Sequence, residues 1–452
     1  MKYITIFFLL FCTGCTTFEQ HKKIIPNTIE QKRFMQKSKM KKLNLSYEAK
    51  NLIHEINIHN FTLKSLEQSI QSYLALTKTE QSRNKPKISA EISNTTSLEK
   101  NTYKQKTKNL SLGLSLNWTL DIFGKIADEI KATQLEYKQA KLHYIHTKRE
   151  LFAEALGLHT DLIYYDNALK NNLEQKDILK ILYSSQKEAY IKGLTAFREY
   201  MEAKTAFEKI NHQTEALHVE YMQVLYALNI LRGSDPKKKL SLKQYPLSKI
   251  TLNEEFTINA TDLNQRADLQ SSFLTVKILQ NKESATYKAL LPQITLSGQY
   301  ATTGQKLNEL FNGNFIWQFI GGITQPIFNA EELNSLAKSK SKEVQSSYFK
   351  YQEKVLNAIK EIDETLAQIN LLKKQNKIYQ SELNNTIKSL HSQERKYKSM
   401  QINLSEYLEE KLTWLQIKQN LEKTNAQYIK LKIKLALLGG ILAKEEINNV
   451  QK

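Results

Sequence analysis

The chain repeats itself at a distance of nearly half its length, and this internal duplication limits its possible folds more than any other feature. Pro86 opens a stretch of alternating apolar and polar residues, and Pro292 opens another one 206 residues later (292 − 86). Phe123 and Phe328 mark a second shared landmark at an offset of 205 (328 − 123). Such near-constant offsets indicate two copies of one structural unit.

The first part of each copy predicts a pair of short β-strands. Leucine or tryptophan occupies every second position from Leu110 to Trp118, with small polar residues between them. This period of two places the apolar side chains on one face of a strand. An apolar face opposite a polar face is typical of a membrane barrel, although a soluble sandwich has the same alternation. The expected strands cover 88–96 and 110–118 in the first copy, and 294–303 and 315–324 in the second.

Each strand pair leads into a helix much longer than a globular core requires. No proline lies between Pro86 and Pro236, and Gly157 is the only glycine between residue 125 and about residue 190. A helix of about 65 residues is about 100 Å long, because each residue adds about 1.5 Å. Its apolar residues recur at intervals of seven along two separate seams, which predicts a neighbouring helix on each side. Shorter helices are expected to run back to Gly233 and Gly440.

These patterns divide the chain into two repeats with short flanking segments. The N-terminal residues combine a charged start with a short apolar run, as in a signal peptide, followed by a polar arm. The predicted boundaries are 1–14 for the signal peptide, 15–44 for the arm, 45–233 for the first repeat, 234–262 for the linker, 263–440 for the second repeat and 441–452 for the tail.

Cys15 is a candidate for lipid attachment. The small residues Thr13 and Gly14 precede it, as in a bacterial lipobox, and Thr16 follows it where aspartate would favour the inner membrane. Ordinary signal cleavage beside an incidental cysteine is the alternative. Elsewhere no segment approaches the roughly 20 apolar residues of a transmembrane helix, so membrane insertion would require a closed barrel. About eight strands are needed for the smallest such barrel, so several chains would have to share one.

The formal net charge of +19 raises the question of nucleic-acid binding. The lysines are scattered among polar residues on helices, which favours a solvated surface and no nucleic-acid partner. His143 and His146 lack neighbouring residues that would complete a metal site. No nucleotide-binding loop and no catalytic Ser-His or Cys-His motif is present, so the sequence predicts no enzyme activity, metal or cofactor.

Three motifs occur in order and at the spacing of the repeat: Trp118 to Lys125, Arg266 to Leu269, and Gln325 to Phe328. Together, over about residues 45–440, they resemble the TolC/OprM family of outer-membrane factors, in its acylated, NodT-like branch. The resemblance implies a mainly α-helical homotrimer with a twelve-stranded membrane β-barrel and a twelve-helix α-barrel of long antiparallel coiled-coil hairpins.

The same resemblance implies a function. The chain would be the outer-membrane channel subunit of a tripartite efflux or type I secretion system, lipid-anchored and extending into the periplasm. Its partners would be a periplasmic adaptor (membrane fusion) protein, an inner-membrane RND, MFS or ABC pump, and outer-membrane lipid. From the residues alone, a periplasmic coiled-coil scaffold or adaptor lipoprotein is the alternative.

The resemblance also assigns roles to individual residues. The strand–helix junction would be formed by Trp118, Asp121, Phe123, Gly124, Pro326 and Phe328. The two helical turns would form a periplasmic tip that contacts the adaptor through Tyr190, Lys192, Gly193, Leu194, Met400 and Gln401. The aperture and gate would be formed by Glu406, Glu409, Glu199 and Tyr397.

The gate residues depart from the family pattern in two places. Glu406 and Glu409 are three residues apart and therefore lie on one helix face, as an acidic aperture ring requires. A solvated face of a charged coil is the alternative. Ile402 stands where the family has a gating arginine, and Met400 stands where it has a turn glycine. These departures leave open how the closed tip is held.

Overall fold

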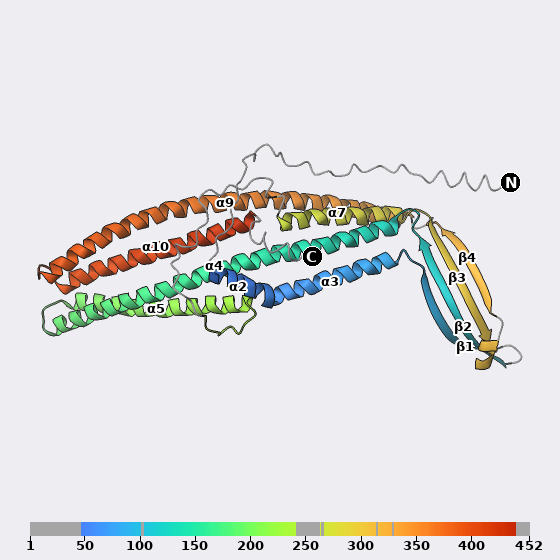
Figure 1. Ribbon diagram of the computed structural model, residues 1–452, viewed down its shortest axis with the longest axis horizontal. Coiled ribbons are helices and arrows are strands. Elements are labelled where there is room, and N and C mark those ends of the chain that lie inside the picture. Colours follow the sequence, from blue (N-terminus) through green and yellow to red (C-terminus); the bar gives the residue numbers. More distant parts are fainter. Residues whose placement is uncertain are drawn as a thin grey trace, which may run out of the picture.

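The computed structural model describes residues 47–100, 104–240, 263, 266–312, 315–327 and 330–439. Figure 1 shows an elongated molecule, with long helices at one end and a sheet at the other. The predicted signal peptide, the arm with Cys15, most of the linker and the tail lie outside the described residues, as do Phe328 and Gly440. Among the described helices, none combines the length and apolarity needed to cross a membrane.

The described elements form two series in the same order, each with a helical segment before a strand pair and a long helical hairpin after it. The first contains α2 (Tyr47–His59), α3 (Phe61–Ser82), β1 (Lys87–Lys100), β2 (Lys104–Leu120), α4 (Lys125–Ile191) and α5 (Phe197–Leu231). The second contains α7 (Ala267–Lys288), β3 (Gln293–Gly304), α8 (Leu307–Asn312), β4 (Ile316–Thr324), α9 (Ala330–Lys398) and α10 (Leu404–Leu438).

The helical segment that precedes the first strand pair is divided at Asn60, which separates α2 from α3. The Asn60 side-chain oxygen accepts a hydrogen bond from the Leu63 N–H at 3.0 Å, and so caps the start of α3. Its amide nitrogen donates to the carbonyl of Leu231 at 2.8 Å, which ties this break to the end of α5.

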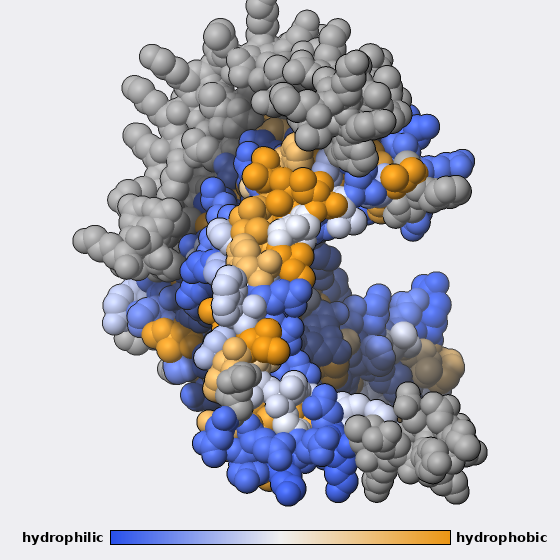
Figure 2. Space-filling view, turned by 90° about the vertical axis from the view of Figure 1, so that its right-hand side faces the viewer, coloured by the Kyte–Doolittle hydropathy of each residue, from blue (hydrophilic) through white to orange (hydrophobic). Residues whose placement is uncertain are grey.

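The four strands form one antiparallel sheet in the order β1-β2-β3-β4, and its two faces differ in polarity. The register places Leu114 opposite Ala90 and Tyr300, and Tyr300 opposite Trp317. On the other face, the hydroxyls of Ser89 and Ser115 lie 2.8 Å apart. Seen from the sheet end, Figure 2 shows apolar side chains gathered in a band with hydrophilic side chains beside it. The predicted two-faced strands are therefore confirmed.

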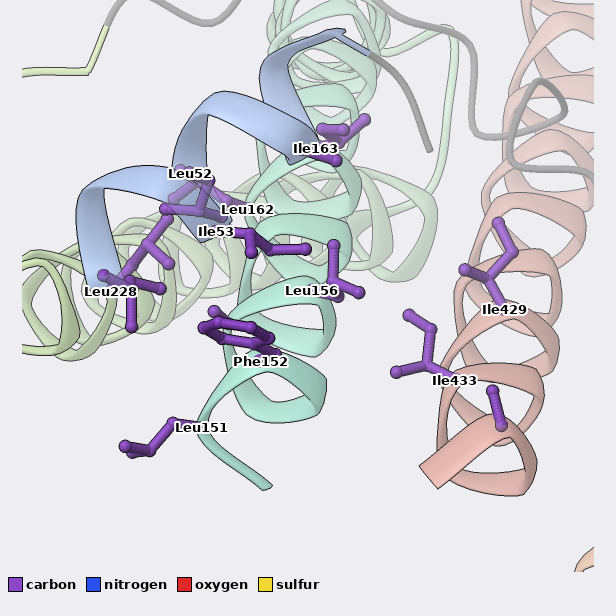
Figure 3. Close-up of a cluster of buried hydrophobic side chains, with 14 of the residues drawn as sticks. Leu52, Ile53, Leu151, Phe152, Leu156, Leu162, Ile163, Leu228, Ile429 and Ile433 are labelled. Atoms are coloured by element: carbon purple, nitrogen blue, oxygen red, sulfur yellow. The ribbon is translucent and has the colours of Figure 1, made fainter. Parts of the chain in front are cut away.

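The long helix α4 has neighbours on both sides, as its two apolar seams predicted. It packs against α3 and α5 on one side and against α7 and α10 on the other, and α9 in turn packs against α7 and α10. The main core lies where α2, α4, α5 and α10 meet, with Phe152 and Leu162 of α4 fully buried. In Figure 3, Ile429 and Ile433 of α10 lie on the side that faces α4. The helices thus form an arc rather than a closed bundle.

Candidate functional site

The two helical hairpins end in turns of the same geometry. In the first turn, the N–H groups of Gly193 and Leu194 donate to carbonyls three and five residues earlier, at 3.0 and 2.8 Å. In the second turn, Met400 and Gln401 do the same at 2.9 and 2.8 Å. This pair of bonds is the Schellman motif, whose residue after the helix takes a left-handed conformation. Gly193 has φ of 72° and Met400 has φ of 59°.

Because Met400 holds a left-handed conformation, Met400→Gly is expected to stabilise the second turn by about 1 kcal/mol. Met400 is 93% exposed, so the substitution removes little packing. Gly193→Ala is the reciprocal variant, since no atom lies within 4 Å of the added Cβ and only the φ angle opposes it. Hydrogen exchange at the turn amides should slow about fivefold in the first variant and accelerate in the second. Equal exchange in all three proteins would contradict this account of the turn.

Aromatic rings brace both hairpins next to the turns. Tyr190 stacks on Tyr200 with ring centroids 5.4 Å apart, and Tyr397 stacks on Tyr407 at 5.5 Å. Beyond these rings the tips are exposed and partly apolar, since Leu194 is 76% exposed. The candidate tip residues of each hairpin therefore lie together at its end (Figure 1).

The candidate aperture residues are exposed on the first turns of α10. The Asn403 side chain caps this helix by accepting a hydrogen bond from the Glu406 N–H at 2.9 Å, which leaves the Glu406 carboxylate free of the cap. The Glu409 carboxylate accepts a hydrogen bond from the Ser405 hydroxyl at 3.1 Å. Both carboxylates thus remain available on an exposed helix face.

The two gate candidates from different hairpins do not meet within one chain. The hairpin that carries Tyr397 and the one that carries Glu199 end apart in Figure 1. Within the described residues, the Oε2 atom of Glu199 is buried without a hydrogen-bond partner, and Arg198 approaches its other oxygen at 3.8 Å. A contact between the candidates requires the hairpins to approach each other or a neighbouring chain to take part.

The strand–helix junction residues have structural roles. Asp121 accepts hydrogen bonds from the N–H groups of Ile126 at 3.0 Å and Ala127 at 2.7 Å, and so caps the first turn of α4. Gly124 precedes this helix with φ of 75°, a conformation that glycine adopts without strain. Phe123 is 41% exposed at the same turn. The motif is therefore the means by which a strand passes directly into a long helix.

In each repeat, a side chain at the end of the strand pair donates a hydrogen bond to a backbone carbonyl just before the pair begins. The Trp118 indole N–H donates to the carbonyl of Asn84 at 3.1 Å. In the second repeat the Gln325 amide donates to the carbonyl of Leu290 at 2.9 Å, and Pro326 follows at once. The duplicated landmarks thus correspond to duplicated contacts.

A buried group of charges joins α4, α7 and α9 near the middle of the molecule. The Asp268 carboxylate accepts hydrogen bonds from Arg266 at 3.1 and 3.0 Å, and the Lys354 ammonium lies 3.9 Å from it. Burial raises the pKa of Asp268, but the hydrogen bonds and charge of Arg266 outweigh it, so the pKa lies below its usual value. Arg149 of α4 is also buried, and burial lowers the pKa of its guanidinium.

The sequence pointed to only part of this charge cluster. Arg266 and Asp268 belong to a recognised motif, whereas Arg149 and Lys354 are distant in sequence and carry no local signal. His146, a rejected metal candidate, pairs with Glu150 at 3.2 Å. Across the described ranges, no three His, Cys, Asp or Glu residues are grouped so that they can hold a metal ion.

Comparison with known proteins gives a consistent result. The family model described as "Outer membrane efflux protein" matches residues 52–234 and 261–440. "Probable outer membrane lipoprotein SilC" of Salmonella typhimurium is 25% identical over 67% of this chain and 62% of its own length. "Cation efflux system protein CusC" of Escherichia coli K12 is 23% identical over 71% of this chain and 70% of its own length.

Solved structures share the fold over more of the chain. A crystal structure of CusC superimposes with a TM-score of 0.79 at 22% identity, over 90% of this chain and 95% of the other. The CmeC outer membrane channel of Campylobacter jejuni superimposes with a TM-score of 0.80 at 18% identity, over 90% and 89%. The sequence alignment with SilC spans less than two thirds of that relative, whereas the fold matches almost throughout.

Proposed function

This chain belongs to the outer membrane efflux protein family, so it is an efflux protein of the outer membrane, and we propose that three copies of it form a passive export duct. The observation that carries the proposal is the sheet of four two-faced strands continued by an arc of long helices. Strands β1 and β4 lie at its two edges, each with one side unpaired. Three such sheets joined edge to edge make a twelve-stranded barrel, large enough to close around an aqueous lumen.

The helices support the same assembly. Helix α9 lies at one end of the arc, where it packs against α7 and α10. Phe349, Leu356 and Ile378 form an apolar stripe along it and are 65%, 60% and 58% exposed. Exposed apolar residues in rows mark contact surfaces. We assign this stripe to the neighbouring copy, so that three arcs close into a twelve-helix α-barrel.

The remaining partners follow from this assembly. The exposed tips, with Leu194 and Met400 at their ends, would meet a periplasmic adaptor protein, and an inner-membrane RND, MFS or ABC pump would supply the energy. Cys15 would carry the lipid anchor. The name of CusC refers to cation efflux. Because a duct of this kind is wide and polar, we place cargo selection in the pump.

The experiment that tests the duct is ion conductance of the purified protein in a planar bilayer. Discrete conductance steps are expected. Tyr397→Phe, which keeps the ring stacked on Tyr407 but removes the hydroxyl, should raise the open fraction if the tip is closed at rest. Silence of both proteins after verified insertion would instead favour the periplasmic scaffold.

The acidic aperture makes a separate prediction. Combining Glu406→Gln with Glu409→Gln should lower cation selectivity and weaken block by divalent cations, because rings of carboxylates attract cations. The reversal potential under a salt gradient and the block by added divalent cations measure both effects. Glu208→Gln with Glu215→Gln, exposed on α5 away from the tips, is the matched control. Identical selectivity in the two double variants would remove Glu406 and Glu409 from the aperture.

A further inference from the structure

The seam between α4 and α10 joins the hairpin of the first repeat to that of the second. Two apolar clusters hold it. One includes Ile429 and Ile433 of α10, packed in the main core, and the other joins Leu408 and Leu415 of α10 to Ile178 of α4. An outward movement of the α9–α10 hairpin at the tip would have to open the second cluster first.

Between these clusters the seam is polar. The Asn171 amide donates to the carbonyl of Leu415 at 2.9 Å, and the Gln175 amide donates to the Gln419 side chain at 3.2 Å. Asn171 is 4% exposed, so these bonds are shielded from water. A buried polar stretch is stable only while its partners stay in register. This polar stretch is therefore the part of the seam at which α10 can separate from α4.

Glu422 lies in this polar stretch at a position that is otherwise apolar. Leu408, Leu415, Ile429 and Ala436 share its place in the seven-residue repeat of α10, and all four are buried. The Oε2 atom of Glu422 is buried with no hydrogen-bond partner among the described residues. Glu422 as a whole is half-buried. A negatively charged oxygen without a partner is costly in such a place, whereas the neutral acid costs much less.

We propose that Glu422 is a proton-sensitive brake on the duct: protonated, it holds the α4–α10 seam packed, and its ionisation loosens the seam so that the α9–α10 hairpin moves away from α4. This inference rests on the proposed function, since it concerns opening of the same tip. Glu422 lies about twenty positions after the second turn. It would control the opening of the tip without lining the aperture.

The surrounding charges agree with this role. Tyr164 of α4 interacts with Glu422, and it also lies near Asp161 of α4 and Glu220 of α5. On α10 itself, Lys418 favours the ionised form of Glu422. Burial is the larger influence and raises the pKa of Glu422 above its usual value. Asp161 is itself paired with Lys430 of α10. From α4, the surroundings of Glu422 thus add the Tyr164 phenol, which does not compensate the charge of an ionised carboxylate.

The direction of the pH effect follows from the raised pKa. The packed seam favours the protonated acid, so it is most stable below the ordinary pKa of glutamate. It loses that stability as the pH rises through the raised pKa, because the separated seam lets water solvate the carboxylate. Acid should therefore keep the tip closed, and neutral pH should release it.

Glu422→Gln tests the brake, because the amide imitates the neutral acid in shape and cannot ionise. Hydrogen exchange of the amides in residues 408–424 is compared between wild type and variant from about pH 3.5, below the ordinary pKa of glutamate, to about pH 7.5. The ratio of the wild-type exchange rate to the variant exchange rate should be near one at the lower pH. It should rise as the pH increases, up to about tenfold for each unit by which the pKa is raised. Glu410→Gln, a half-buried carboxyl on α10, should leave the wild-type pH dependence unchanged.

A ratio that does not change with pH overturns the proposal, as does the same response in Glu410→Gln. Hydrogen exchange needs only the folded protein, so its outcome is separate from whether a pore conducts. Conductance then tests the link to opening. The wild-type open fraction should rise with pH, and that of Glu422→Gln should stay low. A Glu422→Gln channel that keeps the wild-type pH response would also overturn the brake.

Discussion

Replacing Asp268 by asparagine is expected to lower the free energy of unfolding by about 3–5 kcal/mol, the cost of leaving buried charges without their counter-ion. Asp268 accepts two hydrogen bonds from Arg266, and it lies near Lys354 and Arg149 as well. The asparagine amide retains much of the volume but cancels the negative charge, so the buried guanidinium groups of Arg266 and Arg149 lose this counter-ion. Glu361, 3.8 Å from Arg266 and half-exposed, replaces it only in part. The thermal unfolding midpoint and the yield of assembled protein measure the loss.

Asp166→Asn is the matched control. Asp166 pairs with Lys170 at 2.7 Å on the exposed side of α4, where an ion pair contributes less than about 1 kcal/mol. The pH dependence adds a second check, because the pKa of Asp268 is lowered by folding. Its stabilisation is complete above the usual aspartate value of 3.8 and is lost as the pH falls through the lowered pKa. Equal loss of stability in the two variants would contradict a buried charge cluster.

The parts of the fold that were predicted correctly are those with a local periodicity. A period of two revealed all four strands, and the seven-residue repeats together with the lack of proline revealed α4 nearly to its last residue. The break at Asn60 has no periodicity that would reveal it, because its signal is a single capping residue inside an otherwise helical pattern. Its selection depends on the contact with Leu231, which is 171 residues away in the sequence.

The candidate sites divide in the same way. The turns could be placed by comparing the repeats, but that Met400 keeps the left-handed conformation of Gly193 is visible only in the backbone. The charge cluster joins Arg149, Asp268 and Lys354 from three helices, so no sequence spacing reveals it. Glu422 is an intermediate case. Its position in the seven-residue repeat of α10, which buried apolar residues otherwise occupy, can be identified from the sequence. The lack of a hydrogen-bond partner for its Oε2 atom is visible only in the structure.

A charged residue placed on the apolar face of the sheet should prevent insertion into the membrane. Leu114→Arg adds a guanidinium at the centre of that face, between Ala90 and Tyr300. An arginine facing lipid near the bilayer midplane costs about 2–4 kcal/mol, and three copies share one barrel in the proposed assembly. The amount of assembled protein in outer-membrane fractions should therefore fall sharply.

Gln299→Arg is the control that separates lipid contact from general disruption. Gln299 pairs in register with Ser115, so it lies one position from the level of Leu114 but on the opposite, polar face. An arginine there would face the aqueous lumen and should leave assembly intact while altering ion selectivity. If both variants assemble equally well, the apolar face does not contact lipid. If both fail, the polar face is packed rather than wet. Only the unequal outcome agrees with a membrane barrel whose two faces meet different solvents.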